Sequence, residues 1–177
     1  MSRPLRLRPP RHRVARRAIT WWTARTLLLA VPAAALPAAA GLPAVAAALP
    51  SAAGPVLDPA RVWLWAAAGV LGGVGLLIAA VVPVWRYRVH RWEVTEAAVY
   101  TSSGWLWQEW RVAPMSRIQT VDTGRGPLQR LFGLSSVTVT TASAAGPLSI
   151  DGLDHRRATA LADRLTASTE AAKGDAT

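Results

Sequence analysis

Two long stretches of this chain contain no charged residue, and they constrain the fold more than any other feature. Residues 26–57 and residues 62–85 carry no Asp, Glu, Lys or Arg. A helix over residues 62–85 would be about 36 Å long, which is enough to cross a hydrocarbon layer of about 30 Å. Tryptophans flank this second stretch, with Trp63 and Trp65 at its start and Trp85 at its end, as is typical of membrane–water interfaces. The pattern predicts a transmembrane helix over residues 62–85.

The first uncharged stretch predicts another transmembrane helix, over residues 27–49, and leaves one alternative open. It is rich in Ala and contains Pro32, Pro37 and Pro43, which membrane helices tolerate when neighbouring helices satisfy the released carbonyls. The alternative is a cleaved secretory signal, since basic residues precede the apolar run. Because the run is longer than the core of about 7–15 residues in a signal peptide, we favour a retained helix.

The positive charge of the chain is concentrated before the first apolar run. The formal net charge is +10, and residues 1–25 contribute +8 of it because they hold eight arginines and no acid. Positive flanks remain in the cytoplasm, and Arg86, Arg88 and Arg91 follow the second run. We therefore expect a multi-pass protein of the inner cell membrane with both termini cytoplasmic. Prolines in the Arg-rich tail predict no fixed structure up to about Val14.

The Arg-rich tail is compatible with binding to anionic lipid or to nucleic acid. Because it directly precedes a predicted span, membrane lipids are the favoured partner, at roughly 1 kcal/mol per basic residue near an anionic surface. The remaining chain shows no aromatic and basic platform for stacking bases. A membrane-tethered nucleic-acid binder, which would show a steep salt dependence, is therefore the second, disfavoured alternative to the function predicted below.

The second span also contains a spacing that lets helices approach closely. Gly69 and Gly73 lie four residues apart, which matches the small-x-x-x-small pattern of membrane helix packing. Their partner is either the Ala-rich first helix of the same chain or a second copy in an oligomer. We favour the first helix because it is tethered nearby.

Residues 87–171 show the pattern of a small α+β domain, and residues 172–177 are expected to be a disordered tail. Short apolar and polar alternations between turn signals predict antiparallel strands, over residues 91–94, 98–101, 105–112, 118–123, 137–140 and 148–150. A C-terminal helix is expected to begin after Asp154 as N-cap and to continue to about Ala171.

A single helical turn is expected between two of these strands. Leu128, Leu131 and Phe132 have the spacing of one apolar helix face, with Gln129 and Arg130 pointing outward. Gly133 follows the turn, in the usual place for a helix C-terminus.

Three motifs in this region are distinctive in combination: residues 112–121, residues 126–134 and residues 137–141. Together they resemble the bacterial pleckstrin-homology (PH) domain of YdbS-like membrane proteins, over about residues 86–166 and the preceding pair of helices. The resemblance implies a pleckstrin-like β-barrel or sheet with a C-terminal helix over one end, on the cytoplasmic face. The expected organisation is an Arg-rich cytoplasmic tail (1–25), a transmembrane helical hairpin (26–86), the α+β pleckstrin-like domain (87–171) and the short tail (172–177).

No residue pattern points to an enzyme. His12, His90 and His155 are expected to be solvated or interfacial, and the spacing of Asp151, Asp154 and His155 specifies no metal site. The chain has no Cys, which excludes cysteine-ligated zinc, and it contains neither a serine nucleophile elbow nor a dinucleotide-binding glycine motif. We expect no catalytic residue, no cofactor and no metal.

Three arginines flank the distinctive motifs and are the candidate binding residues. Arg117, Arg125 and Arg130 could form a patch for a lipid headgroup or an acidic partner; alternatively they are solvated or pair with Glu109 and Asp122. The predicted function is a membrane-anchored, non-enzymatic interaction module that binds protein partners or lipid headgroups, and its partners could include another membrane PH-domain protein. The alternative is a structural subunit of a transport or secretion complex, which the absence of charges in both spans disfavours.

Overall fold

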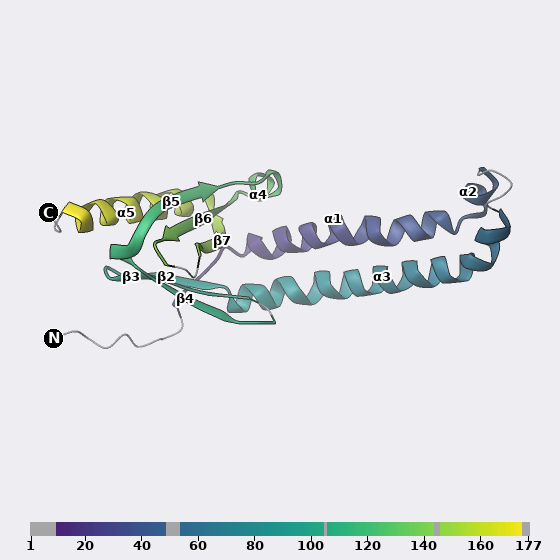
Figure 1. The fold of residues 1–177 in the computed structure, drawn as a ribbon, viewed down its shortest axis with the longest axis horizontal. Coiled ribbons are helices and arrows are strands. Elements are labelled where there is room, and N and C mark those ends of the chain that lie inside the picture. The colour runs from purple at the N-terminus through teal and green to yellow at the C-terminus, as the bar shows by residue number, and fades with distance from the viewer. Residues whose placement is uncertain (1–9, 49–53, 105, 144–145, 175–177) are drawn as a thin grey trace. The chain divides into compact units, whose positions relative to one another are not determined.

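The computed structural model describes residues 10–48, 54–104, 106–143 and 146–174. Within them the chain divides into two compact units (Figure 1). Residues 22–83 form the helical unit, and the residues before 22 and after 83 together form the α+β unit.

Three helices account for the first part of the chain: α1 (Arg17–Ala40), α2 (Pro43–Ala48) and α3 (Gly54–Val89). Helix α1 and the Pro59–Val89 part of α3 are long and apolar enough to cross a membrane. Helix α1 begins and ends earlier than the predicted helix 27–49, and α3 extends beyond 62–85 at both ends. Arg and Ala are good helix formers, so the basic segment from Arg17 onwards is helical although it lacks a continuous apolar pattern.

Small residues bring α1 and α3 together as an antiparallel pair within the helical unit. A Cβ atom built on Gly75 would lie 2.5 Å from Cβ of Ala30, and one on Gly72 would lie 3.5 Å from Cβ of Ala34. On one side of these contacts Thr23 Oγ1 of α1 donates to Ala79 O of α3 at 3.3 Å, and on the other side Arg61 Nε of α3 donates at 3.2 Å to the carbonyl of Gly41, the residue after α1. The absence of a side chain at Gly72 and Gly75 therefore sets how closely the helices approach.

Gly69 and Gly73, the predicted packing pair, lie on a different face of α3. Both are exposed, and a Cβ on either would meet no atom within 4 Å. At about 100° per residue, these two glycines lie roughly a quarter to a third of a turn away from the face of Gly72 and Gly75. The favoured prediction that they pack against the first helix is wrong; a role between copies of the chain stays a prediction.

The α+β unit contains two open antiparallel sheets, and its α+β, PH-like class is as predicted. Sheet A has the order β1 (His12–Arg13), β2 (Arg91–Val94), β3 (Ala98–Ser103) and β4 (Glu109–Pro114). Sheet B has the order β5 (Ile118–Gly124), β6 (Leu134–Thr141) and β7 (Leu148–Asp154). A 3₁₀ turn (Met115–Arg117) joins the sheets, α4 (Pro127–Leu131) connects β5 to β6, and α5 (His155–Gly174) follows β7.

The core of the α+β unit lies between sheet B and α5. Fully buried apolar side chains project from β6 and β7, and the apolar stripe of α5 is buried as well. These residues are Leu134, Val137, Val139, Ile150, Leu153, Ala158 and Leu165. Their alternation along the strands and their helical spacing along α5 explain why the sequence predicted these elements.

The first strand and the last turns of α5 differ from the predictions. His12 and Arg13 pair with Trp92 and Arg91 as an edge strand, and the neighbouring Val14 is buried. The prediction of no fixed structure up to Val14 is therefore wrong for residues 10–14, because β2 offers unpaired backbone groups to this segment. Helix α5 continues to Gly174, into the predicted disordered tail; residues 1–9 and 175–177 lie outside the described residues.

The predicted strand 105–112 is shorter in the structure, since β4 begins at Glu109. Trp105 lies outside the described residues, and Leu106 to Gln108 form the connection between β3 and β4. Gly104 has φ +106°, and a Cβ there would overlap the carbonyl of Trp107. This connection therefore requires glycine at position 104.

Candidate functional site

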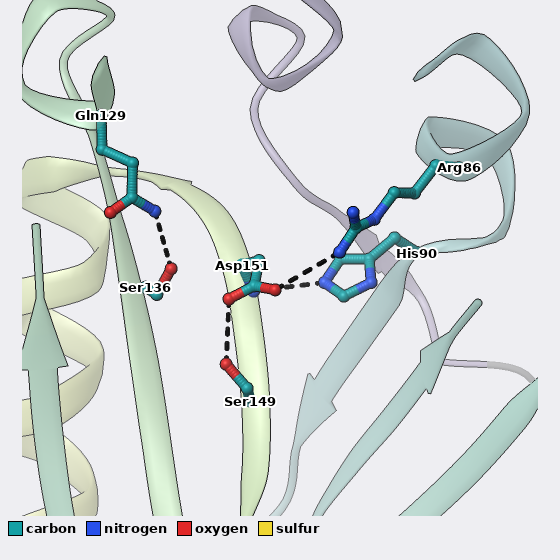
Figure 2. A network of polar contacts seen from close by, with 6 residues as sticks. All are labelled: Arg86, His90, Gln129, Ser136, Ser149 and Asp151. Carbon is teal, nitrogen blue, oxygen red and sulfur yellow. Dashed lines mark hydrogen bonds and ion pairs between the residues drawn. The ribbon is translucent and has the colours of Figure 1, made fainter. Parts of the chain in front are cut away.

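A polar cleft lies where α3 ends and β7 passes. Arg86 and His90 are separated by one helical turn, and both reach Asp151 (Figure 2). Arg86 Nη2 lies 3.5 Å from Asp151 Oδ2, and the backbone N–H of Asp151 donates to His90 Nε2 at 3.2 Å. Ser149 Oγ donates to the other carboxylate oxygen of Asp151 at 2.9 Å. Asp151 thus joins the end of α3 to sheet B through both its side-chain carboxylate and its backbone N–H.

His90 is held in its neutral form. Its side chain is only 2% exposed, and burial lowers its pKa from 6.5 to about 4, against the opposing attraction of Asp151 and with a smaller contribution from Arg86. Because Nε2 accepts the Asp151 N–H, the neutral ring carries its proton on Nδ1. The prediction that His90 is solvated or interfacial is wrong, and a protonated ring could not accept this hydrogen bond.

The cleft has a volume of about 420 Å³, and its charges are balanced. On the side of β4, Arg111 Nε lies 2.6 Å from Glu109 Oε1, and Arg111 Nη1 donates to Pro147 O at 2.6 Å. Each arginine of the cleft therefore has an acid beside it. This arrangement joins the two sheets and the end of α3 rather than presenting an unneutralised charge to a ligand.

A second depression, which we call the cationic groove, has the opposite character. It has a volume of about 440 Å³ and runs between α5 and the β1–β2 edge of sheet A. Its lining consists of His12, Trp92, Val94, Arg157, Ala160, Leu161 and Arg164, with no acid among them. The rings of His12 and Trp92 lie 5.2 Å apart. The groove combines an apolar floor with two guanidinium groups.

The two arginines of the groove are placed by the helical repeat. Arg157 and Arg164 are seven residues apart on α5, so they project from one face about 10 Å apart. Both are exposed, and among the described residues neither side chain makes a hydrogen bond or ion pair. These two residues were not among those predicted from the sequence, although their seven-residue spacing on the predicted helix was a signal that could have found them.

The three arginines of the predicted patch are only partly brought together. Arg117 precedes β5 and Arg125 follows it, so the strand separates them by roughly 25 Å. Arg125 Nε donates to Leu134 O at 3.1 Å, while Arg130 is exposed on α4. The structure therefore brings Arg125 and Arg130 to one end of β5 and leaves Arg117 at the other; their binding role stays a prediction.

The suggested pairing of these arginines with two acids is not seen among the described residues. Glu109 pairs with Arg111, and the carboxylate of Asp122 accepts a hydrogen bond from Thr120 Oγ1 at 3.2 Å.

Helix α4 differs from the prediction in two side chains. Gln129, expected to point outward, is buried: its Oε1 accepts from the Gly126 N–H at 2.9 Å and its Nε2 donates to Ser136 Oγ at 2.8 Å (Figure 2). Leu131, expected on the apolar face, is 77% exposed. Gln129 occupies the inward position because it caps the start of this short helix. Gly133 ends the turn with φ +67°, as predicted.

The remaining histidine and aspartates have separate structural partners. Asp154 Oδ1 accepts from the Arg156 N–H at 3.1 Å, which confirms it as the N-cap of α5, and His155 Nδ1 lies 3.0 Å from Ser135 Oγ. In the part of the chain that the structure describes, no three His, Asp or Glu side chains are grouped as metal ligands.

Comparison with known proteins identifies the family of this fold. Residues 26–169 match the family model described as Bacterial PH domain. The chain belongs to this bacterial PH-domain family. It is also 35% identical over 108 residues to the transmembrane protein YdbS of Bacillus subtilis (strain 168), an alignment that covers 59% of this chain and 67% of that protein. No solved structure matches.

The family and the helices together define a membrane-associated PH module. The matched relative is itself a transmembrane protein, and two helices here have the length and apolarity of membrane spans. The resemblance to YdbS-like membrane proteins that the three sequence motifs suggested is thereby confirmed.

Proposed function

We propose that this PH-family protein is a membrane-anchored, non-enzymatic module that binds an acidic segment of a partner protein in the cationic groove. The observation that carries the proposal is the unneutralised pair Arg157 and Arg164 above an apolar floor. Guanidinium groups bind carboxylates through charge-assisted hydrogen bonds. The aromatic floor of Trp92 adds apolar contact area for the same segment.

The spacing of the two arginines favours an extended peptide over a single headgroup. Residues in an extended chain rise about 3.3 Å each, so carboxylates three residues apart would lie about 10 Å apart. That separation matches the distance of about 10 Å between Arg157 and Arg164 along α5. A single lipid phosphate would reach only one of them.

The proposed orientation places both termini in the cytoplasm. Basic residues support it, since Arg16 and Arg17 stand at the start of α1 and Arg86 and Arg88 lie in the last turn of α3, and positive flanks remain cytoplasmic. Reporter fusions at Ser51 and at the C-terminus test this topology. A C-terminal reporter that is active only outside the cytoplasm would contradict it.

The binding proposal is tested with the full chain in lipid nanodiscs and a defined probe. The probe is a fluorescent octapeptide with glutamates at its second and fifth positions, and its control carries glutamines there. We expect Arg157→Glu and Arg164→Glu each to weaken binding of the acidic peptide about tenfold or more, since a charge-assisted hydrogen bond contributes about 1.5–3 kcal/mol.

Arg156→Glu is the matched control, because Arg156 is exposed on the same helix but does not line the groove. Equal binding of the acidic and glutamine peptides would overturn the proposal, as would acidic-peptide binding that survives both groove variants. Displacement of the peptide by soluble glycerophosphoglycerol, with no displacement by free glutamate, would assign the groove to a lipid phosphate instead.

A further inference from the structure

The exposed large apolar side chains of the α+β unit are confined to few places. Outside α1 and α3, and among the described residues, they are Leu106, Trp107 and Trp110 around the β3–β4 connection and Leu131 on α4. Trp107 is 83% exposed and Leu131 is 77% exposed. Single exposed leucines are ordinary on protein surfaces, but a fully projecting Trp beside an exposed Leu calls for a partner.

A local backbone constraint lies beside each group of exposed apolar side chains. The β3–β4 connection turns at Gly104, whose φ of +106° and close approach to the Trp107 carbonyl admit no side chain. Helix α4 is held at its start by the buried Gln129 and ends at Gly133. The turns beside these apolar side chains therefore depend on Gly104 and Gly133.

The strand register places the β3–β4 connection at a particular end of the unit. Arg91 pairs with Ser102, and Ser103 pairs with Glu109, so the connection extends beyond the start of β2. The residue before β2 is His90, and α3 ends at Val89. The connection thus lies at the end of sheet A where β2 begins, one residue after the end of α3.

The end of α4 lies close to the start of α1, as the β3–β4 connection lies close to the end of α3. A Cβ built on Gly133, two residues after α4, would be 3.3 Å from Nη1 of Arg17, the first residue of α1. The two apolar projections therefore occupy the end of the α+β unit through which the chain enters and leaves the membrane-spanning helices.

We infer that Trp107 with Leu106, and Leu131, insert into the interfacial layer of the membrane that the protein spans. A bilayer fits this end because amphipathic Trp rings favour the headgroup level. The basic residues there complement anionic headgroups: Arg16, Arg17, Arg88, Arg91 and Arg130. The α+β unit is thereby attached to the bilayer at two apolar points besides its covalent links, independently of what the cationic groove binds.

The absence of Cys from the chain makes a site-specific test direct. Full-length Gln108→Cys, Leu131→Cys and Ser116→Cys proteins are labelled with the environment-sensitive dye NBD in liposomes, with or without lipid carrying a doxyl quencher in its acyl chain. Ser116 is the control because it is exposed in the 3₁₀ turn, at the end of β4 away from the β3–β4 connection.

We expect the doxyl lipid to quench NBD at positions 108 and 131 but not at position 116, with blue-shifted emission at the first two. Adding Trp107→Asp to the Gln108→Cys protein should abolish the quenching at position 108. Emission at positions 108 and 131 that is unquenched, like that at 116, would overturn the inference. Blue-shifted but unquenched emission would also overturn it, since a protein surface would then cover these residues. No acidic peptide is used, so failure here is separate from failure of the groove proposal.

Discussion

Lowering the pH is expected to destabilise the α+β unit through His90. The pKa of His90 is lowered from 6.5 to about 4 in the folded chain, so the unfolded chain binds the proton first as pH falls. The contribution of neutral His90 is fully present above pH 6.5 and is lost as pH falls toward 4. Each pKa unit corresponds to about 1.4 kcal/mol, so the full difference amounts to about 3 kcal/mol.

The expected loss between pH 7 and pH 5 is about 2 kcal/mol, because pH 5 lies within this interval. Urea unfolding of the full chain in detergent micelles, followed by circular dichroism at both pH values, measures it. His90→Gln removes the titrating group while retaining an oxygen that can accept the Asp151 N–H. The variant should lose about 2 kcal/mol less than the wild type over the same interval.

The matched control is His155→Gln, whose side chain is exposed and which should retain the wild-type loss. Subtracting the variant from the wild type also removes every pH-dependent contribution that the two proteins share. If His90→Gln and the wild type lose equal stability from pH 7 to pH 5, the buried neutral histidine is not the cause.

Two pairs of substitutions test the helix packing of the helical unit and the α5 cap of the α+β unit. Gly75→Ala should destabilise the α1–α3 pair by about 1–3 kcal/mol through overlap with Ala30. Gly73→Ala faces open space and should be neutral or slightly stabilising. Titration with sodium dodecyl sulfate measures both, and equal effects of the two substitutions would contradict the assigned helix faces. Asp154→Ala should lower the unfolding free energy of the α+β unit by about 1 kcal/mol through loss of the N-cap, whereas Asp154→Asn should retain the wild-type value. Urea unfolding measures both, and equal unfolding free energies of the two variants would exclude the capping role.

The elements that the sequence predicted well are those whose pattern is local. Strand β2 has the predicted bounds, Arg91–Val94, and the caps at Gly133 and Asp154 are as predicted. Each depends on residues within a few positions of itself, through alternation, a positive φ or a side-chain cap. The family resemblance rested on motifs in the same region.

The features that sequence reasoning missed depend on distant partners. Strand β1 exists because residues 12 and 13 meet β2 some eighty positions later, and His90 is buried against Asp151, sixty-one positions away. The two glycine faces of α3 also differ only in where α1 lies. Composition and periodicity carry no information about such contacts, so the sequence could propose glycine packing but not select the face.

Arginines of the α+β unit take part in two arrangements whose responses to salt differ. In the polar cleft, Arg86 and Arg111 each lie within 3.5 Å of a carboxylate, so the charges are compensated inside the folded unit. In the cationic groove, Arg157 and Arg164 have no acid among the lining residues. Rising salt screens both their mutual repulsion and their attraction for an acidic peptide. Raising salt should therefore weaken acidic-peptide binding while leaving the unfolding free energy of the α+β unit unchanged or slightly higher. A parallel decline of both would mean that the exposed pairs in the cleft, rather than the groove, dominate the electrostatics of this unit.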